Sequence, residues 1–134
     1  MAVPVWTQAA FSHKPARAAI AGGEEGYLVL EYDPEITLAA LEVVFDHIKA
    51  NTLRAVIVTQ VAAKDYDFLL RYFAPQYGMD EDAVTGSANR VLADYWARRT
   101  GAKNFRALQC STDGGVVLMR LQPHYVEISG HLDG

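Results

Sequence analysis

The segment that decides the fold runs from Arg71 to Ala88 and reads RYFAPQYGMDEDAVTGSA. Its first residues close a predicted strand over 66–73, and its last residues open a predicted helix over 87–99. Residues 74–86 contain a proline, two glycines and three consecutive acids, a composition typical of a loop. The segment therefore predicts a loop that delivers the chain into the N-terminus of a helix.

This helix start is a candidate anion site. Gly86 lets the backbone approach a ligand closely, and the first N–H groups of a helix have no partner within the helix. The N–H groups of Gly86, Ser87, Ala88 and Asn89 can therefore hold a carboxylate or phosphate, helped by the helix dipole. The hydroxyls of Thr85 and Ser87 can add hydrogen bonds.

A purely structural interpretation of the same residues stays open. Thr85 or Ser87 can serve as an ordinary N-cap, and the acids at 80–82 favour a helix N-terminus electrostatically. The three carboxylates would also repel an anionic ligand, so some must point away, pair with cations or be protonated. A carboxyl in such a like-charged cleft is a candidate general acid or base.

The remaining elements predict an α+β fold. The helix over 87–99 is apolar on most sides, which is typical of a buried helix, and Gly101 fits its C-terminal cap. A second helix is expected over 37–51, and Val3–Trp6 is a possible edge strand. Further strands are expected at 27–32, 55–61, 105–110, 116–121 and 125–129, with turns at 22–26, 113–115 and 122–124. We expect a mixed or antiparallel sheet wrapped around a central helix.

Composition predicts one soluble globular domain over 1–134. Hydrophobic residues make up 51% of the chain, charged residues 21%, and the net charge is −4. This balance argues against nucleic-acid and anionic-membrane partners, and no apolar run has the length of a membrane span. The cations Arg90, Arg98, Arg99, Lys103 and Arg106 are expected to form a solvated face.

The other reactive residue types predict no further chemistry. The single cysteine, Cys110, cannot form an intrachain disulfide, which favours a reducing, cytoplasmic location, and we expect it to be a buried inert thiol. The four histidines show no metal-ligand spacing, so no metal is expected. No nucleotide-binding loop stands out, and no cofactor is expected.

The pattern R-x-F-A-P-x-x-G-x-x-E-D-x-x-T-G-S-A resembles the signature of the PhzF, or phenazine biosynthesis-like, family, which is related to diaminopimelate epimerase. Gln109, the Gly114–Gly115 turn and residues 126–130 continue the resemblance. Members of that family have two similar lobes, each a sheet wrapped around a central helix, with the active site between them. The resemblance covers the C-terminal lobe only.

The resemblance implies roles for individual residues. Asp82 matches the active-site carboxylate of that lobe. Ser87, with the backbone of Gly86 and Ala88, matches the cradle for the substrate carboxylate. Thr85 stands where related epimerases keep a catalytic cysteine. Asp113 departs from the pattern, because an arginine commonly precedes the two glycines.

Three functions are open at this level. The first is a cofactor-independent isomerase or epimerase that acts on a small carboxylate metabolite by proton transfer. Its active site would lie between two lobes, in a homodimer or with a complementary lobe. The second is a non-catalytic module that binds small acids, since the glutamate of the family's other lobe is not found. The third is an inactive half-length remnant with an exposed apolar face.

Overall fold

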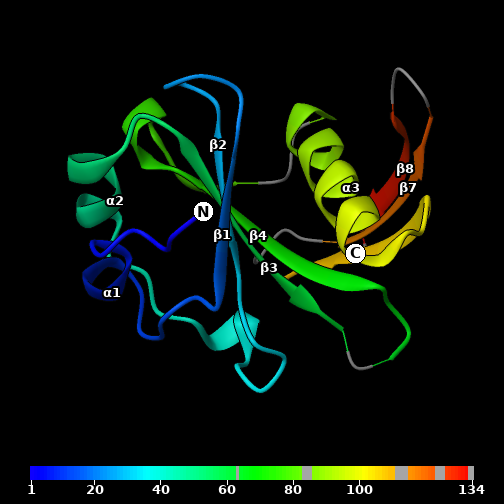
Figure 1. The fold of residues 1–134 in the computed structure, drawn as a ribbon, viewed down its shortest axis with the longest axis horizontal. Coiled ribbons are helices and arrows are strands. Elements are labelled where there is room, and N and C mark those ends of the chain that lie inside the picture. The colour runs from blue at the N-terminus through cyan, green and yellow to red at the C-terminus, as the bar shows by residue number, and fades with distance from the viewer. Residues whose placement is uncertain (63, 83–85, 111–114, 123–125, 133–134) are drawn as a thin grey trace.

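One mixed sheet organises the chain (Figure 1). The computed structural model describes residues 1–62, 64–82, 86–110, 115–122 and 126–132, and only the backbone at 79–82, 86–87 and 126–132. In these residues eight strands form the sheet. They are β1 (Arg17–Ala21), β2 (Tyr27–Glu31), β3 (Ala55–Val61), β4 (Phe68–Ala74), β5 (Met79–Asp82), β6 (Asn104–Gln109), β7 (Gly115–Leu121) and β8 (Val126–Leu132).

The helices are few and unequal in length. The described residues form α1 (Thr7–Ala10), α2 (Phe45–Asn51) and α3 (Gly86–Thr100), with short 3-10 turns η1 (Leu38–Ala40) and η2 (Pro75–Tyr77). The strand order is β1-β2-β3-β4-β6-β7-β8, and β5 pairs with β4. The β2–β3 and β4–β6 pairs are parallel, and the other pairs are antiparallel. The expected α+β class and mixed sheet are therefore confirmed.

The central strands bury side chains on both faces. Successive side chains of a strand point to opposite faces, so β3 serves two cores. Ile57 belongs to a cluster with Leu92 and Trp96 of α3. Its neighbours Val56 and Val58 belong to a second cluster, which contains residues of α1, η1 and α2. Burial on both faces explains why β3 reads as an almost unbroken apolar run rather than an alternating one.

Helix α3 is the central helix that the sequence predicts. It begins and ends within one residue of the expected bounds, and Ala88, Leu92, Ala93 and Trp96 are buried. Gly101 has φ +79°, and its N–H donates to the carbonyl of Ala97 across 2.8 Å. A left-handed glycine that closes the last turn is the predicted cap.

The helix expected over 37–51 is wrong in its first half, because α2 begins only at Phe45. The carbonyls of Leu38 and Leu41 accept hydrogen bonds from the Arg71 guanidinium, at 3.0 and 2.8 Å. The N–H of Val44 donates to the carbonyl of Ala10 across 2.7 Å. These tertiary partners replace the bonds that a continuous helix would make over 38–44.

The N-terminal expectation is also wrong. Residues 3–6 form no strand and lead into α1, where the Thr7 hydroxyl donates to the carbonyl of Pro4 across 2.6 Å. The first strand is β1, which the sequence did not predict. The turn expected at 22–26 is confirmed. Of the other two turns, residues 113–114 and 123–124 lie outside the described part of the chain.

Candidate functional site

Helix α3 begins at the same end of the sheet as the turn that joins β1 to β2 (Figure 1). Trp96 donates to Thr59 and Arg99 to Glu31, so the C-terminal half of α3 lies beside the carboxyl ends of β2 and β3. A helix rises about 1.5 Å per residue, which brings its first turn back to the level of Tyr27 and Ala55. Figure 1 shows the start of α3 and the β1–β2 turn at the same end of the molecule.

The loop that leads to this helix is anchored to the start of β3. The Gln76 side-chain amide donates to the carbonyl of Arg54 across 2.6 Å, and the Tyr77 hydroxyl donates to the carbonyl of Leu53 across 2.8 Å. Gly78 then turns the chain with φ +82°. The acceptor of each hydrogen bond is a backbone carbonyl. The two bonds therefore hold η2 at this end of the sheet whatever the side chains of Leu53 and Arg54 are.

The residues expected to bind the substrate or to react come after Gly78 in the chain. Asp82 is the last residue of β5 and pairs with Tyr72 of β4. Gly86 and Ser87 open α3, and Ala88 is fully buried. Thr85 and Asp113 lie outside the described residues. Asp82, Gly86 and Ser87 therefore all lie at the start of α3 or a few residues before it in the chain. The catalytic and binding roles of these residues remain predictions.

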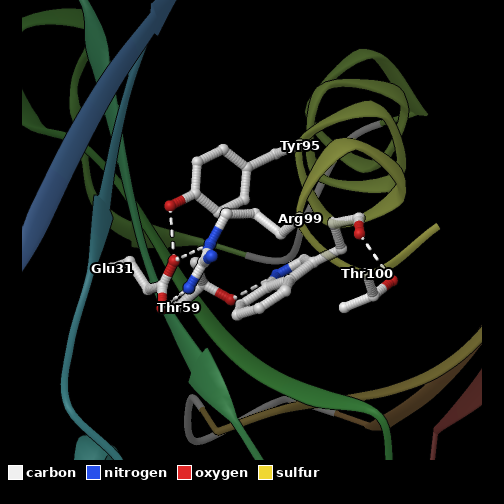
Figure 2. Close-up of polar contacts among 6 residues, drawn as sticks. Glu31, Thr59, Tyr95, Arg99 and Thr100 are labelled. Atoms are coloured by element: carbon white, nitrogen blue, oxygen red, sulfur yellow. Dashed lines mark hydrogen bonds and ion pairs between the residues drawn. The ribbon is translucent and has the colours of Figure 1, made fainter. Parts of the chain in front are cut away.

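A polar cluster fixes the far end of α3 to the sheet (Figure 2). Glu31 is 6% exposed and reaches from β2 toward α3. Its Oε1 accepts hydrogen bonds from the Tyr95 hydroxyl at 2.5 Å and from Arg99 Nε at 2.9 Å. Its Oε2 accepts one from Arg99 Nη2 at 3.1 Å. A two-pronged guanidinium–carboxylate pair constrains angle as well as distance, so it orients α3 against β2.

The cluster shifts the acidity of its members. Burial raises the pKa of Glu31, but hydrogen bonds from Arg99 and Tyr95 and the charges of Arg99 and Arg17 outweigh it, so that this pKa lies below its ordinary value of 4.5. Burial raises the pKa of Tyr95, and its hydrogen bond to Glu31 raises it further. Glu31 is therefore a fixed anion and Tyr95 a fixed donor at neutral pH.

The expected solvated face of cations is confirmed for Arg90, Arg98, Lys103 and Arg106, which are exposed. Arg98 pairs with exposed Asp94, one turn before it, at 3.1 Å. Arg99 is different because it binds buried Glu31. No sequence signal links these two residues, which are 68 positions apart. Cys110 follows β6 directly and is half-buried rather than buried.

Other sites are scarce in the described residues. No group of three or more His, Cys, Asp or Glu side chains there is placed to hold a metal ion. An open pocket of about 530 Å³ is lined by residues 23–26 of the β1–β2 turn and by Leu53. Nor does any helix in those residues have the length and apolarity to cross a membrane.

The sequence of this chain is similar to those of known proteins. A family model described as phenazine biosynthesis-like protein, PhzC-PhzF, matches residues 3–132. An uncharacterized isomerase of Pseudomonas aeruginosa is 40% identical over 106 residues, which are 79% of this chain and 40% of that protein. A phenazine biosynthesis-like domain-containing protein of Rattus norvegicus is 53% identical over 58 residues, which are 43% of this chain and 20% of that protein.

The fold is shared as well. A PhzF-family phenazine biosynthesis protein of Enterococcus faecalis superposes with a TM-score of 0.85 and 29% identity, over 100% of this chain and 51% of that one. A PhzC/PhzF protein of Clostridium difficile gives a TM-score of 0.68 at 28% identity, over 81% of this chain and 42% of that one. The chain thus spans about half, or less, of the length of these relatives. It belongs to the phenazine biosynthesis-like, PhzC/PhzF, family.

Proposed function

We propose that this chain is one lobe of a cofactor-independent isomerase that acts on a small carboxylate metabolite by proton transfer. One observation carries the proposal: the family motif leads from β5, ending at Asp82, directly into the N-terminus of the buried central helix at Gly86. The helix dipole and the amides of the first turn favour a carboxylate at that position. Relatives named as isomerases support the reaction type.

Asp82 is the proposed proton carrier. A carboxylate can accept a proton from a carbon next to a carboxyl group and return it to another position. This transfer moves a hydrogen atom or inverts the configuration of the carbon without any redox change. Ser87 and the backbone of Gly86 and Ala88 are the proposed cradle for the substrate carboxylate, and Thr85 is a further proposed binding residue. Holding the carboxylate at the helix start would place the reacting carbon near Asp82.

A second lobe completes the proposed site. In a homodimer related by a two-fold axis, two Asp82 carboxylates and two helix starts would face one another across one substrate. Two like charges at close range do not ionise equally, so one Asp82 would carry a proton while the other accepts one. A separate complementary lobe could supply the opposite half instead.

Two measurements test this function. The mass of the purified 134-residue chain in solution, from sedimentation or light scattering, should be twice 14.7 kDa. Proton–deuterium exchange at the carbon next to the carboxylate, followed by NMR with a panel of small amino and hydroxy acids, should occur with the wild type. Asp82→Asn should abolish it, and Asp94→Asn, at an exposed helix position, should not.

The outcomes separate the candidate functions. Carboxylate binding without exchange would favour the non-catalytic binding module. A strictly monomeric chain, with no partner recovered, would exclude the homodimer. Aggregation with neither binding nor a defined oligomer would favour the inactive remnant.

A further inference from the structure

Asn89 is a buried polar residue with an unsatisfied oxygen in the first turns of α3. It is the fourth residue of the helix and is 4% exposed. Its Oδ1 is buried, and no group in the described part of the chain donates a hydrogen bond to it. Leaving a buried acceptor unpaired is costly, and most buried polar atoms in proteins are paired. The position therefore requires a reason for keeping an amide.

Helix geometry turns Asn89 toward the helix start. Side chains of an α-helix tilt toward its N-terminus, so the Asn89 amide lies over the turn that begins at Gly86. Its place in the sequence puts it on the same face as buried Ala93 and Trp96, whereas the next residue, Arg90, is exposed. The amide is thus on the buried side of α3, within one helical turn of the proposed carboxylate cradle in the chain.

The other unsatisfied buried atoms differ in kind. Arg54 Nε and Gln76 Oε1 also have no partner in the described residues, but both side chains are only half-buried. These two residues contact each other, because Gln76 Nε2 donates a hydrogen bond to the Arg54 carbonyl. Asn89 is set apart by full burial and by its place at the start of the central helix.

We propose that Asn89 determines specificity, by accepting a hydrogen bond from a hydroxyl or ammonium group of the ligand. The ligand class is then a carboxylic acid that carries such a donor near its carboxylate, and bare acids are discriminated against. The inference rests on the proposed function for the place of the carboxylate. It adds the residue that recognises the second group of the ligand.

The physical reason for discrimination is the unpaired oxygen itself. An acid that carries a hydroxyl or ammonium group gains a hydrogen bond to this oxygen, whereas a bare acid leaves the oxygen unpaired in the complex as it is in the free protein. In the free protein the unpaired Asn89 oxygen lowers the stability of the fold. Asn89→Leu, which is apolar and of similar size, removes that cost and should leave the free protein as stable as the wild type or more so.

The test uses two matched sets of probes with the full chain. Binding of lactate and alanine is compared with binding of propionate, by calorimetry or NMR titration. The wild type should prefer the donor-bearing acids by about tenfold or more. Asn89→Leu should erase this preference and keep propionate binding. Asn104→Ala, at an exposed position on β6, is the control and should keep the preference.

The possible failures are distinguishable. Equal binding of the three acids by the wild type, or an unchanged preference in Asn89→Leu, would overturn the role of Asn89 and leave the carboxylate cradle intact. If none of the acids binds the wild type, both the cradle and the role of Asn89 are overturned. If Asn89→Leu does not fold, Asn89→Ala removes the acceptor without adding volume, and loss of preference in that variant supports the proposal.

Discussion

Trp96 and Thr59 meet at the centre of the protein, where the indole Nε1 donates to the Thr59 Oγ1 across 3.1 Å. The Thr59 hydroxyl in turn donates to the carbonyl of Leu69 across 2.6 Å. Both residues are at most 2% exposed. The hydroxyl therefore connects α3, β3 and β4 in one chain of hydrogen bonds, and it fixes the depth of the helix against the sheet.

Thr59→Val should destabilise the protein by about 1–3 kcal/mol, because it leaves the indole N–H buried without an acceptor at nearly constant volume. Chemical denaturation with unchanged m-value is the measurement. Thr37→Val is the control, since Thr37 is exposed and its side chain caps nothing. Equal stability of the two variants would contradict a structural role for the hydroxyl.

Glu31→Gln should change how stability depends on pH. The pKa of Glu31 is lowered on folding, so the unfolded chain binds more protons in acid, and stability rises with pH there. Its contribution is present above the ordinary pKa of 4.5 and is lost as pH falls through the lower pKa of the folded state.

Thermal unfolding between pH 2 and 7 checks this expectation. The Glu31→Gln variant should lie about 2 kcal/mol below the wild type near neutrality, and the gap should narrow in acid. Glu35→Gln, at an exposed position, should run parallel to the wild type. A constant gap across the range would mean that the Glu31 carboxylate gains nothing from Arg99.

Arg71→Lys should loosen residues 38–44. Arg71 is 8% exposed, donates to the carbonyls of Leu38 and Leu41, and lies 5.1 Å above the Phe73 ring. Lysine keeps the charge but not the planar guanidinium that makes this contact set. We expect a loss of about 2 kcal/mol and faster hydrogen exchange around η1. Unchanged exchange in that segment would contradict the anchoring role.

Three glycines should rank in a defined order on substitution by alanine. A Cβ at Gly26 would lie 2.1 Å from the carbonyl oxygen of Ala21, so that variant should be the most damaged. Gly101 has open space but φ +79°, which costs an alanine about 1–2 kcal/mol. Gly23 has neither restriction, and its alanine variant should be neutral or slightly stabilised. Melting temperatures of the three variants test the order.

The sequence predicts what local pattern determines. The apolar stripe through Leu92 and Trp96 and the cap at Gly101 place α3 correctly, because burial and capping act within one helix. Residues 38–44 carry a helical pattern as well, but Arg71, some thirty positions away, takes their carbonyls. These tertiary hydrogen bonds outweigh the intrinsic helix propensity of the segment, which is worth only about a few tenths of a kcal/mol per residue.

The residues of the candidate site also divide into those that the sequence predicts and those that only the fold reveals. Asp82 and the T-G-S motif at 85–87 are close together in the chain, so the sequence alone points to them. Glu31 cannot be matched to Arg99 without the fold, because their contact depends on β2 and α3 lying side by side. Asn89 reads as one more polar residue of a helix, and only its burial in the structure distinguishes it.

The parallel pairing of β4 with β6 has a consequence for how the chain folds. Phe68 pairs with Ala107, and β5 and α3 lie between them in the chain. This seam closes a loop of roughly forty residues, and such distant pairings slow folding because the entropy of closure comes before the contacts that offset it. The hairpins on either side need only short turns. We therefore expect the joining of the two parts of the sheet at β4 and β6 to be a slow step in folding.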